Sequence, residues 1–122
     1  MKNRKEAKPV TKERILKTIG LAYRAGLITS GFDSIEMAIH SGAVELLILA
    51  KDGSEKQIAK LRRIAEQEDT NASDFATAEE LGKAIGKPSR IAIAILDEGM
   101  ARKLQDQIEV LSKQEESAKV AE

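Results

Sequence analysis

Two short and almost purely apolar runs constrain the fold of this chain more than any other feature of its sequence. Residues 44–50 (VELLILA) are interrupted only by Glu45, and residues 90–96 (RIAIAIL) alternate large and small aliphatic side chains after Arg90. Runs of this length are typical of strands that helices cover on both faces. Neither run approaches the about 20 apolar residues that a membrane-spanning helix needs. The two runs therefore predict central strands of a buried sheet.

Helical periodicity surrounds these runs. Apolar residues recur at three- and four-residue steps in five segments, and residues that favour helix N-termini precede most of them. The predicted helices begin after Thr11, at Phe32, and after Ser54, Thr77 and Asp97. Two further short strands are expected over residues 27–29 and 74–76. Strands that alternate with helices in a chain of 122 residues predict one α/β domain, an αβα sandwich around a small sheet.

The two ends of the chain depart from this periodicity. Residues 1–10 are rich in Lys and Arg and carry no apolar stripe, so we expect a basic, flexible arm there. Residues 11–111 are expected to form the single domain. Residues 112–122 (SKQEESAKVAE) lose the apolar stripe of the preceding helix and are expected to be disordered or frayed.

Charge is unevenly distributed along the chain. Twenty Lys and Arg residues balance twenty Asp and Glu residues, so the chain lacks the positive excess of a strong non-specific polyanion binder. Residues 1–24, however, contain eight basic and only two acidic residues. This segment is either a solvated start of the domain or part of a local surface for phosphate.

The residue inventory limits the chemistry that the chain can perform. It contains no Cys and one His, so it has no thiolate nucleophile and no multi-histidine metal site. His40 falls in the last turn of a predicted helix, where a structural role is favoured. The sequence contains neither of the glycine-rich nucleotide-binding motifs, G-x-x-x-x-G-K-[ST] or G-x-G-x-x-G after a strand. No secretory signal is visible, so we expect a cytoplasmic protein. Asp52 and Asp97 follow the two strongest strands and either hold a magnesium ion or cap helices.

Four segments carry a family resemblance. They are GLAYRAG (20–26), SGFDSIEMAIHSG (30–42), LLILAKD (46–52) and LGKAIGKPSRIAIAI (81–95). Their order and spacing resemble the L7Ae/L30e superfamily of ribosomal RNA-binding proteins, and within it the small stand-alone bacterial YlxQ-type branch, over about residues 11–103. The resemblance implies a three-layer αβα sandwich with a four-stranded mixed sheet. It also implies a protein that is not an enzyme and needs no cofactor.

The ligand that the resemblance implies is a kink-turn, a sharply bent RNA internal loop with tandem sheared G·A pairs. The family's contact stretch has a glycine, which Gly31 matches, followed by Asn, Glu and Lys. Asp33, Ser34 and Met37 stand at these three positions. Asp33 accepts hydrogen bonds but cannot donate them, and its charge repels phosphates. Ser34 is shorter than Glu and Met37 carries no charge, so weaker binding than is typical of the family is expected.

The family's second contact region is the loop before the last strand, here residues 86–90 (GKPSR). Two cations flank a rigid proline in this loop, and together with Arg24 and Lys51 they are expected to form a basic rim around the helix that starts at Phe32. The alternative is that these are ordinary solvated loop residues. The candidate RNA-binding residues are Arg24, Gly31, Asp33, Ser34, Met37, Lys51, Lys87, Pro88, Ser89 and Arg90.

The main hypothesis is therefore a monomeric, non-enzymatic protein that docks on structured RNA, such as ribosomal RNA. It requires the helix start at Gly31 and the loop at residues 87–90 to share one side of the molecule. The alternative is a protein-interaction module that kept the scaffold and lost kink-turn binding, and an apolar patch including Phe32 and Met37 would favour it. A magnesium-dependent phosphoryl enzyme would instead require Asp52 and Asp97 to converge.

Overall fold

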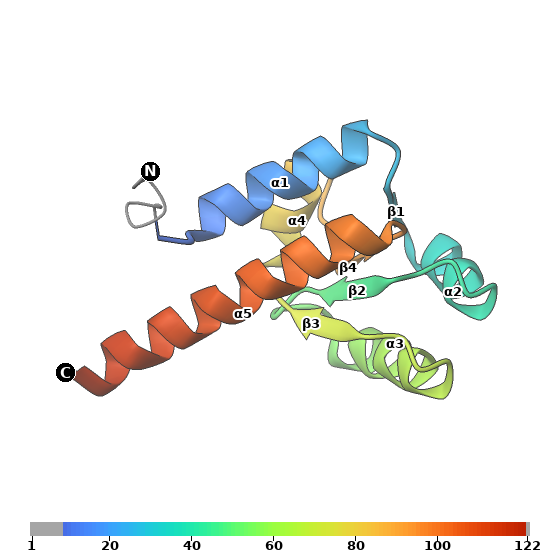
Figure 1. The fold of residues 1–122 in the computed structure, drawn as a ribbon. Coiled ribbons are helices and arrows are strands. Elements are labelled where there is room, and N and C mark those ends of the chain that lie inside the picture. Colours follow the sequence, from blue (N-terminus) through green and yellow to red (C-terminus); the bar gives the residue numbers. More distant parts are fainter. Residues whose placement is uncertain (1–8, 122) are drawn as a thin grey trace.

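The computed structural model describes residues 9–121, and Figure 1 shows how its helices and strands are arranged. In chain order they are α1 (Lys12–Arg24), β1 (Ile28–Ser30), α2 (Phe32–His40), β2 (Leu46–Leu49), α3 (Glu55–Gln67), β3 (Ala72–Asp74), α4 (Ala78–Ala84), β4 (Ala92–Ile95) and α5 (Glu98–Ala121). This confirms the predicted α/β class. Most of the arm expected over residues 1–10 lies outside the described residues.

The four strands form one mixed sheet in the order β1-β4-β2-β3. Strand β2 runs parallel to β3 and antiparallel to β4, and β4 is antiparallel to β1. A continuous row of paired residues, Ser30, Ile93, Ile48 and Ser73, crosses all four strands. Strands β1, β2 and β3 therefore finish at the end of the sheet where β4 begins, which we call the Ser30 end.

Helices cover both faces of the sheet, as the apolar runs predict. Figure 1 shows α1, α4 and α5 on one face and α2 and α3 on the other. Along β4, Ile93 and Ile95 face the first group, whereas Ala92 and Ala94 pack with Ile35 and residues of α3. The alternation of large and small side chains in this strand thus serves two different helical layers.

Capping hydrogen bonds confirm four of the predicted helix starts. Thr77 and Glu80 form a reciprocal capping box, and the Oδ2 of Asp97 accepts a hydrogen bond from the backbone N–H of Met100 at 2.9 Å. Thr11 and Ser54 also accept hydrogen bonds from the first turns of α1 and α3. These caps define where four of the helices begin.

Two sequence expectations differ from the structure. Strand β3 ends at Asp74 rather than Ala76, because Ala76 adopts a left-handed conformation with φ of 65° that cannot continue a strand. Residues 112–121 are helical instead of disordered or frayed. Good helix formers dominate this segment, and the side chain of Gln114 donates a hydrogen bond to the Val10 carbonyl at 2.9 Å. Among the described residues, no helix has the length and hydropathy to span a bilayer.

Candidate functional site

The start of α2 and the loop before β4 lie side by side at the Ser30 end of the sheet. The Nε of Arg90 donates a hydrogen bond to the Ser30 hydroxyl at 3.3 Å, although the two residues are 60 positions apart. Between the segments lies an open hollow of about 250 Å³, which we call the α2 hollow. Its lining is Gly31, Phe32, Ile35, Gln57, Leu61 and residues 89–92. The shared location that the main hypothesis requires is thus present.

Helix α4 holds the loop of residues 86–90 in place. The backbone N–H of Lys87 donates to the Gly82 carbonyl at 2.8 Å, and that of Arg90 donates to the Ala78 carbonyl at 2.9 Å. A methyl group at Gly82 would overlap the carbonyl group of Pro88, so the loop rests directly on the helix backbone. This packing therefore requires glycine at position 82. The side chains of Lys87, Pro88 and Ser89 remain exposed.

Arg90 is the best-fixed cation of the loop. Besides its bond to Ser30, its Nη1 donates to the Ser89 carbonyl at 3.1 Å and to the Pro88 carbonyl at 3.5 Å. The side chain is half-buried. A guanidinium held this way presents its charge in one orientation, so little further ordering is needed when an anion binds.

The start of α2 is open to an external acceptor. Gly31 is its N-cap residue with φ of 96°, a conformation that favours glycine, and it offers no side-chain cap. The first backbone N–H groups of a helix attract anions when no side chain caps them. Asp33 and Ser34 are exposed in the first turn, and Met37 is 68% exposed one turn later. The helix start therefore combines open donors with one carboxylate.

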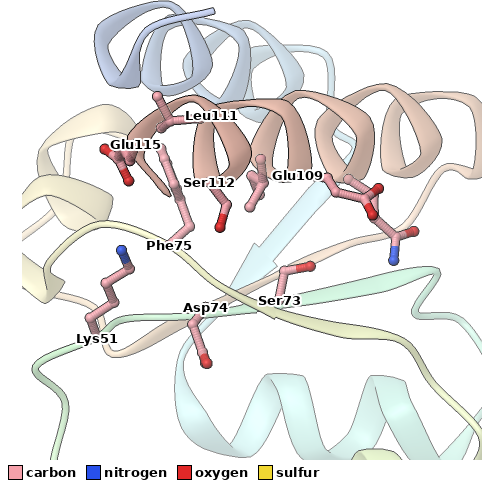
Figure 2. A pocket seen from close by; sticks show the side chains of 10 residues that line it. Lys51, Ser73, Asp74, Phe75, Glu109, Leu111, Ser112 and Glu115 are labelled. Carbon is pink, nitrogen blue, oxygen red and sulfur yellow. The ribbon is translucent and has the colours of Figure 1, made fainter. Parts of the chain in front are cut away.

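Two members of the predicted basic rim do not join it. Arg24 ends α1, ahead of Leu27, whose carbonyl accepts from the Leu96 N–H at the opposite end of the sheet. The backbone of Lys51 does follow β2 at the Ser30 end. Its side chain, however, lies in a groove of about 440 Å³ between β3 and α5, near Phe75 (Figure 2). The cations beside the α2 hollow come from the loop before β4 and from α3.

One of these cations was not among the predicted site residues. The Nζ of Lys60 on α3 lies 5.3 Å from the centroid of the Phe32 ring, at the start of α2. Gln57, on the same side of α3, lines the α2 hollow. Their helical spacing was readable in the sequence, but it could not show which helix α3 packs against. Lys60 therefore joins Arg90 beside the hollow, whereas Arg24 and Lys51 lie away from it.

The carboxylates of the magnesium hypothesis do not converge. The Oδ1 of Asp52 accepts a hydrogen bond from the Ala78 N–H at 2.8 Å, at the start of α4, whereas Asp97 caps α5 at the other end of the sheet. Within residues 9–121, no group of three or more metal-binding side chains is assembled. Asp52 and Asp97 therefore do not form the magnesium site that the alternative of a phosphoryl enzyme would require.

The two apolar side chains of the protein-partner alternative, Phe32 and Met37, differ in their exposure. Phe32 is half-buried and packs against the core under α2 and α3. In the part of the chain that the structure describes, the strongly exposed large apolar side chains are Leu21, Met37 and Val110, which lie on three different helices. His40 links α2 to α3, with its Nδ1 3.3 Å from the Oε2 of Glu68. Within residues 9–121, Phe32 and Met37 therefore do not share the exposed apolar patch that would favour a protein partner.

Solved structures with similar folds include two small proteins. A protein of unknown function from Bacillus halodurans C superimposes with a TM-score of 0.75 and 32% identity, covering 78% of this chain and 96% of that one. The Giardia lamblia 15.5kD RNA binding protein superimposes with a TM-score of 0.70 and covers 86% and 92% of the two chains. Its sequence identity of 18% supports the fold alone.

Sequence relatives are similar over most of the chain. The RNA-binding protein YlxQ of Bacillus subtilis (strain 168) is 30% identical over 86 residues, 70% of this chain and 86% of its own. YlxQ of Enterococcus faecium is 26% identical over 80% of this chain and 94% of its own. The large ribosomal subunit protein eL8 of Cenarchaeum symbiosum (strain A) is 28% identical over 77% of this chain and 75% of its own.

Family membership follows from a match that spans most of the domain. Residues 13–105 match the family described as Ribosomal protein L7Ae/L30e/S12e/Gadd45. The match begins in α1 and ends in α5, so it includes every strand of the sheet and both segments that border the α2 hollow. The chain belongs to the ribosomal protein L7Ae/L30e/S12e/Gadd45 family.

Proposed function

We propose that this protein is a non-enzymatic RNA-binding protein that docks on structured, kink-turn-like RNA through the start of α2 and residues 86–90. The observation that carries the proposal is the hydrogen bond between Arg90 and Ser30, because it joins the two segments into one surface. Two relatives bear the name RNA-binding protein YlxQ, which supports the same ligand class. The proposed partner is structured RNA of the ribosomal type.

The surface offers what a bent RNA backbone needs. The open N-terminus of α2 provides backbone N–H donors and the positive end of the helix dipole. Lys60 and Arg90 lie beside it, and Lys87 adds an exposed cation to the loop of residues 86–90. Contacts of this kind position a protein on RNA, while the carboxylate of Asp33 can accept hydrogen bonds from guanine N–H groups. Shape and phosphate position would therefore contribute most of the recognition.

A titration with matched RNAs tests the proposal. The probe is a labelled kink-turn RNA, its control is the same RNA with the internal loop closed by Watson–Crick pairs, and both are measured at two salt concentrations. We expect tighter binding to the bent RNA and a loss of affinity at higher salt. Equal and negligible binding to both would overturn the proposal and favour the protein-interaction module.

A pair of charge variants tests the location of the site. Arg90→Gln removes a cation beside the α2 hollow, whereas Arg24→Gln removes one at the opposite end of the sheet. We expect only the first to weaken binding to the bent RNA. An equal effect of both variants would show that net charge alone, not this surface, determines affinity.

The cellular context is part of the proposal. One relative is a large-ribosomal-subunit protein, which makes ribosomal RNA the first candidate partner. We propose that the protein acts in the cytoplasm as a monomer. Sequencing of RNA crosslinked to the protein in cells identifies the partner, and light scattering of the purified protein gives its oligomeric state.

A further inference from the structure

Three exposed cations form a stripe along α3. Lys56, Lys60 and Arg63 are spaced by four and three residues, so they lie on one face of the helix. The stripe extends over about 10 Å of the helix axis at 1.5 Å per residue. We call these three residues the α3 stripe.

The α3 stripe borders the proposed RNA site. Its central residue, Lys60, lies over the ring of Phe32 at the start of α2. The opposite flank of α3 carries Arg62, whose Nη2 pairs with the Oδ1 of Asp74 at 2.8 Å on the edge strand β3. Of the four cations of this helix, Lys60 lies beside α2 and Arg62 beside β3, while Lys56 and Arg63 are exposed on the same helix face as Lys60.

Ion pairing among residues 9–121 does not account for the stripe. Like charges three or four residues apart on a helix destabilise it, and Lys56, Lys60 and Arg63 are related in this way. None of the ion pairs formed among residues 9–121 includes any of the three. A helix that accumulates exposed like charges breaks a local rule of stability, and such exceptions are typical of functional surfaces.

The neighbouring surface of α2 is unsuited to phosphate. Asp33 and Glu36 carry negative charge there, and Met37 beside them is uncharged. An RNA strand that leaves the bend at the start of α2 would be repelled along α2 itself and attracted along α3. Charge therefore favours a path of the RNA strand along α3 over a path along α2.

We infer that the α3 stripe binds the phosphate backbone of one RNA stem that extends from the bend. This inference rests on the proposed function and adds a second contact area to it. The cation that α2 lacks at Met37 is thereby replaced by three cations on the neighbouring helix.

A double variant with a matched control tests the inference. Lys56→Gln/Arg63→Gln removes two stripe cations and leaves the contact of Lys60 with Phe32 intact. Arg62→Gln/Lys113→Gln removes the same charge from the opposite flank of α3 and from α5. We expect the first variant to bind the kink-turn RNA more weakly by about 5- to 10-fold per cation at about 0.1 M salt. Its log–log salt slope should fall by about two.

Stability measurements separate binding from folding. Because it relieves like-charge repulsion, the stripe variant should melt at the same temperature as the unmodified protein or slightly higher. Equal losses of affinity in both double variants would overturn the inference. Failure of the unmodified protein to prefer the bent RNA would instead overturn the proposed function, and the stem contact with it.

Shortening the RNA identifies the stem. The two stems of the kink-turn RNA are shortened in turn, and each RNA is titrated with the unmodified protein and the stripe variant. For one stem, we expect shortening to lower the salt slope of the unmodified protein by about two and to abolish the difference between the proteins. If the difference persists with both shortened RNAs, the stripe does not contact a stem.

Discussion

The carbonyl group of Pro88 packs against the backbone of Gly82, leaving no space for a side chain on that helical residue. Gly82→Ala gains about 1 kcal/mol of helix propensity. It also forces the loop of residues 86–90 off α4, and overpacking of this kind costs about 1–3 kcal/mol. We expect a net loss of stability in urea unfolding and weaker binding to kink-turn RNA, because Lys87 and Arg90 move with the loop.

A second glycine in a helix provides the control. A methyl group at Gly99, in the first turn of α5, would meet the Oδ2 of Asp97 at 3.5 Å, which is ordinary contact. Gly99→Ala should therefore leave RNA binding unchanged and stabilise the protein by up to about 1 kcal/mol. A Gly82→Ala variant that behaves in the same way would show that the loop is not held by this contact.

The hydrogen bond between Arg90 and Ser30 is testable without changing net charge. Arg90→Lys keeps the cation but loses the Nε–H donor and the planar group that contacts the loop carbonyls. We expect it to weaken RNA binding by about 1 kcal/mol, the contribution of one such bond. Ser30→Ala should have a smaller effect alone and little effect when combined with Arg90→Lys. Simple addition of the two losses in this double-mutant cycle would contradict the coupling.

Features that depend on neighbouring residues in the chain were predictable from the sequence. The capping box of Thr77 and Glu80 and the Asp97 cap need only a spacing of three residues, and both occur. The two central strands were predictable because burial on both faces requires uninterrupted apolar residues. Strand β3 was misplaced because it lies at an edge of the sheet, where its apolar pattern is weak.

The composition of the candidate site depends on packing between distant segments. Arg24 and Lys51 are close in sequence to elements of the site, yet one lies at the other end of the sheet and the other extends toward α5. Lys60 enters because α3 packs against α2, a contact that no local pattern encodes. The pairing of Gly31 with the loop of residues 86–90 could be predicted only through the family resemblance.

The ion pair between Lys12 and Glu80 should make stability depend on pH. Its Nζ and Oε2 atoms are 2.9 Å apart and join α1 to α4. The hydrogen bond from Lys12, aided by that from the Thr77 backbone, lowers the pKa of Glu80 below its ordinary value of 4.5. The hydrogen bond to Glu80 raises the pKa of Lys12 above 10.5. The stabilisation is therefore complete between these values, is lost as pH falls through the lowered pKa of Glu80, and is lost as pH rises through the raised pKa of Lys12.

Glu80→Gln isolates this contribution. The amide oxygen can still accept from the Thr77 N–H, so the cap is retained while the charge pair is removed. We expect the free energy of unfolding of the variant to change less than that of the unmodified protein as pH falls from neutrality to below 4.5. Because the pair is largely solvated, the difference should be small and should shrink at high salt. Parallel pH curves for the two proteins would contradict the assignment.

Met37 marks the position where a cation would most directly restore the family pattern. Its side chain is 68% exposed, so Met37→Lys should leave stability nearly unchanged. We expect it to strengthen kink-turn binding and to steepen the log–log salt slope by about one, whereas Met37→Gln should do neither. Asp33 lies four residues earlier on α2 and would pair with the new cation, which limits the gain. Asp33→Asn/Met37→Lys should therefore bind more tightly than Met37→Lys alone. If neither variant changes affinity or salt slope, the RNA backbone does not approach this part of α2.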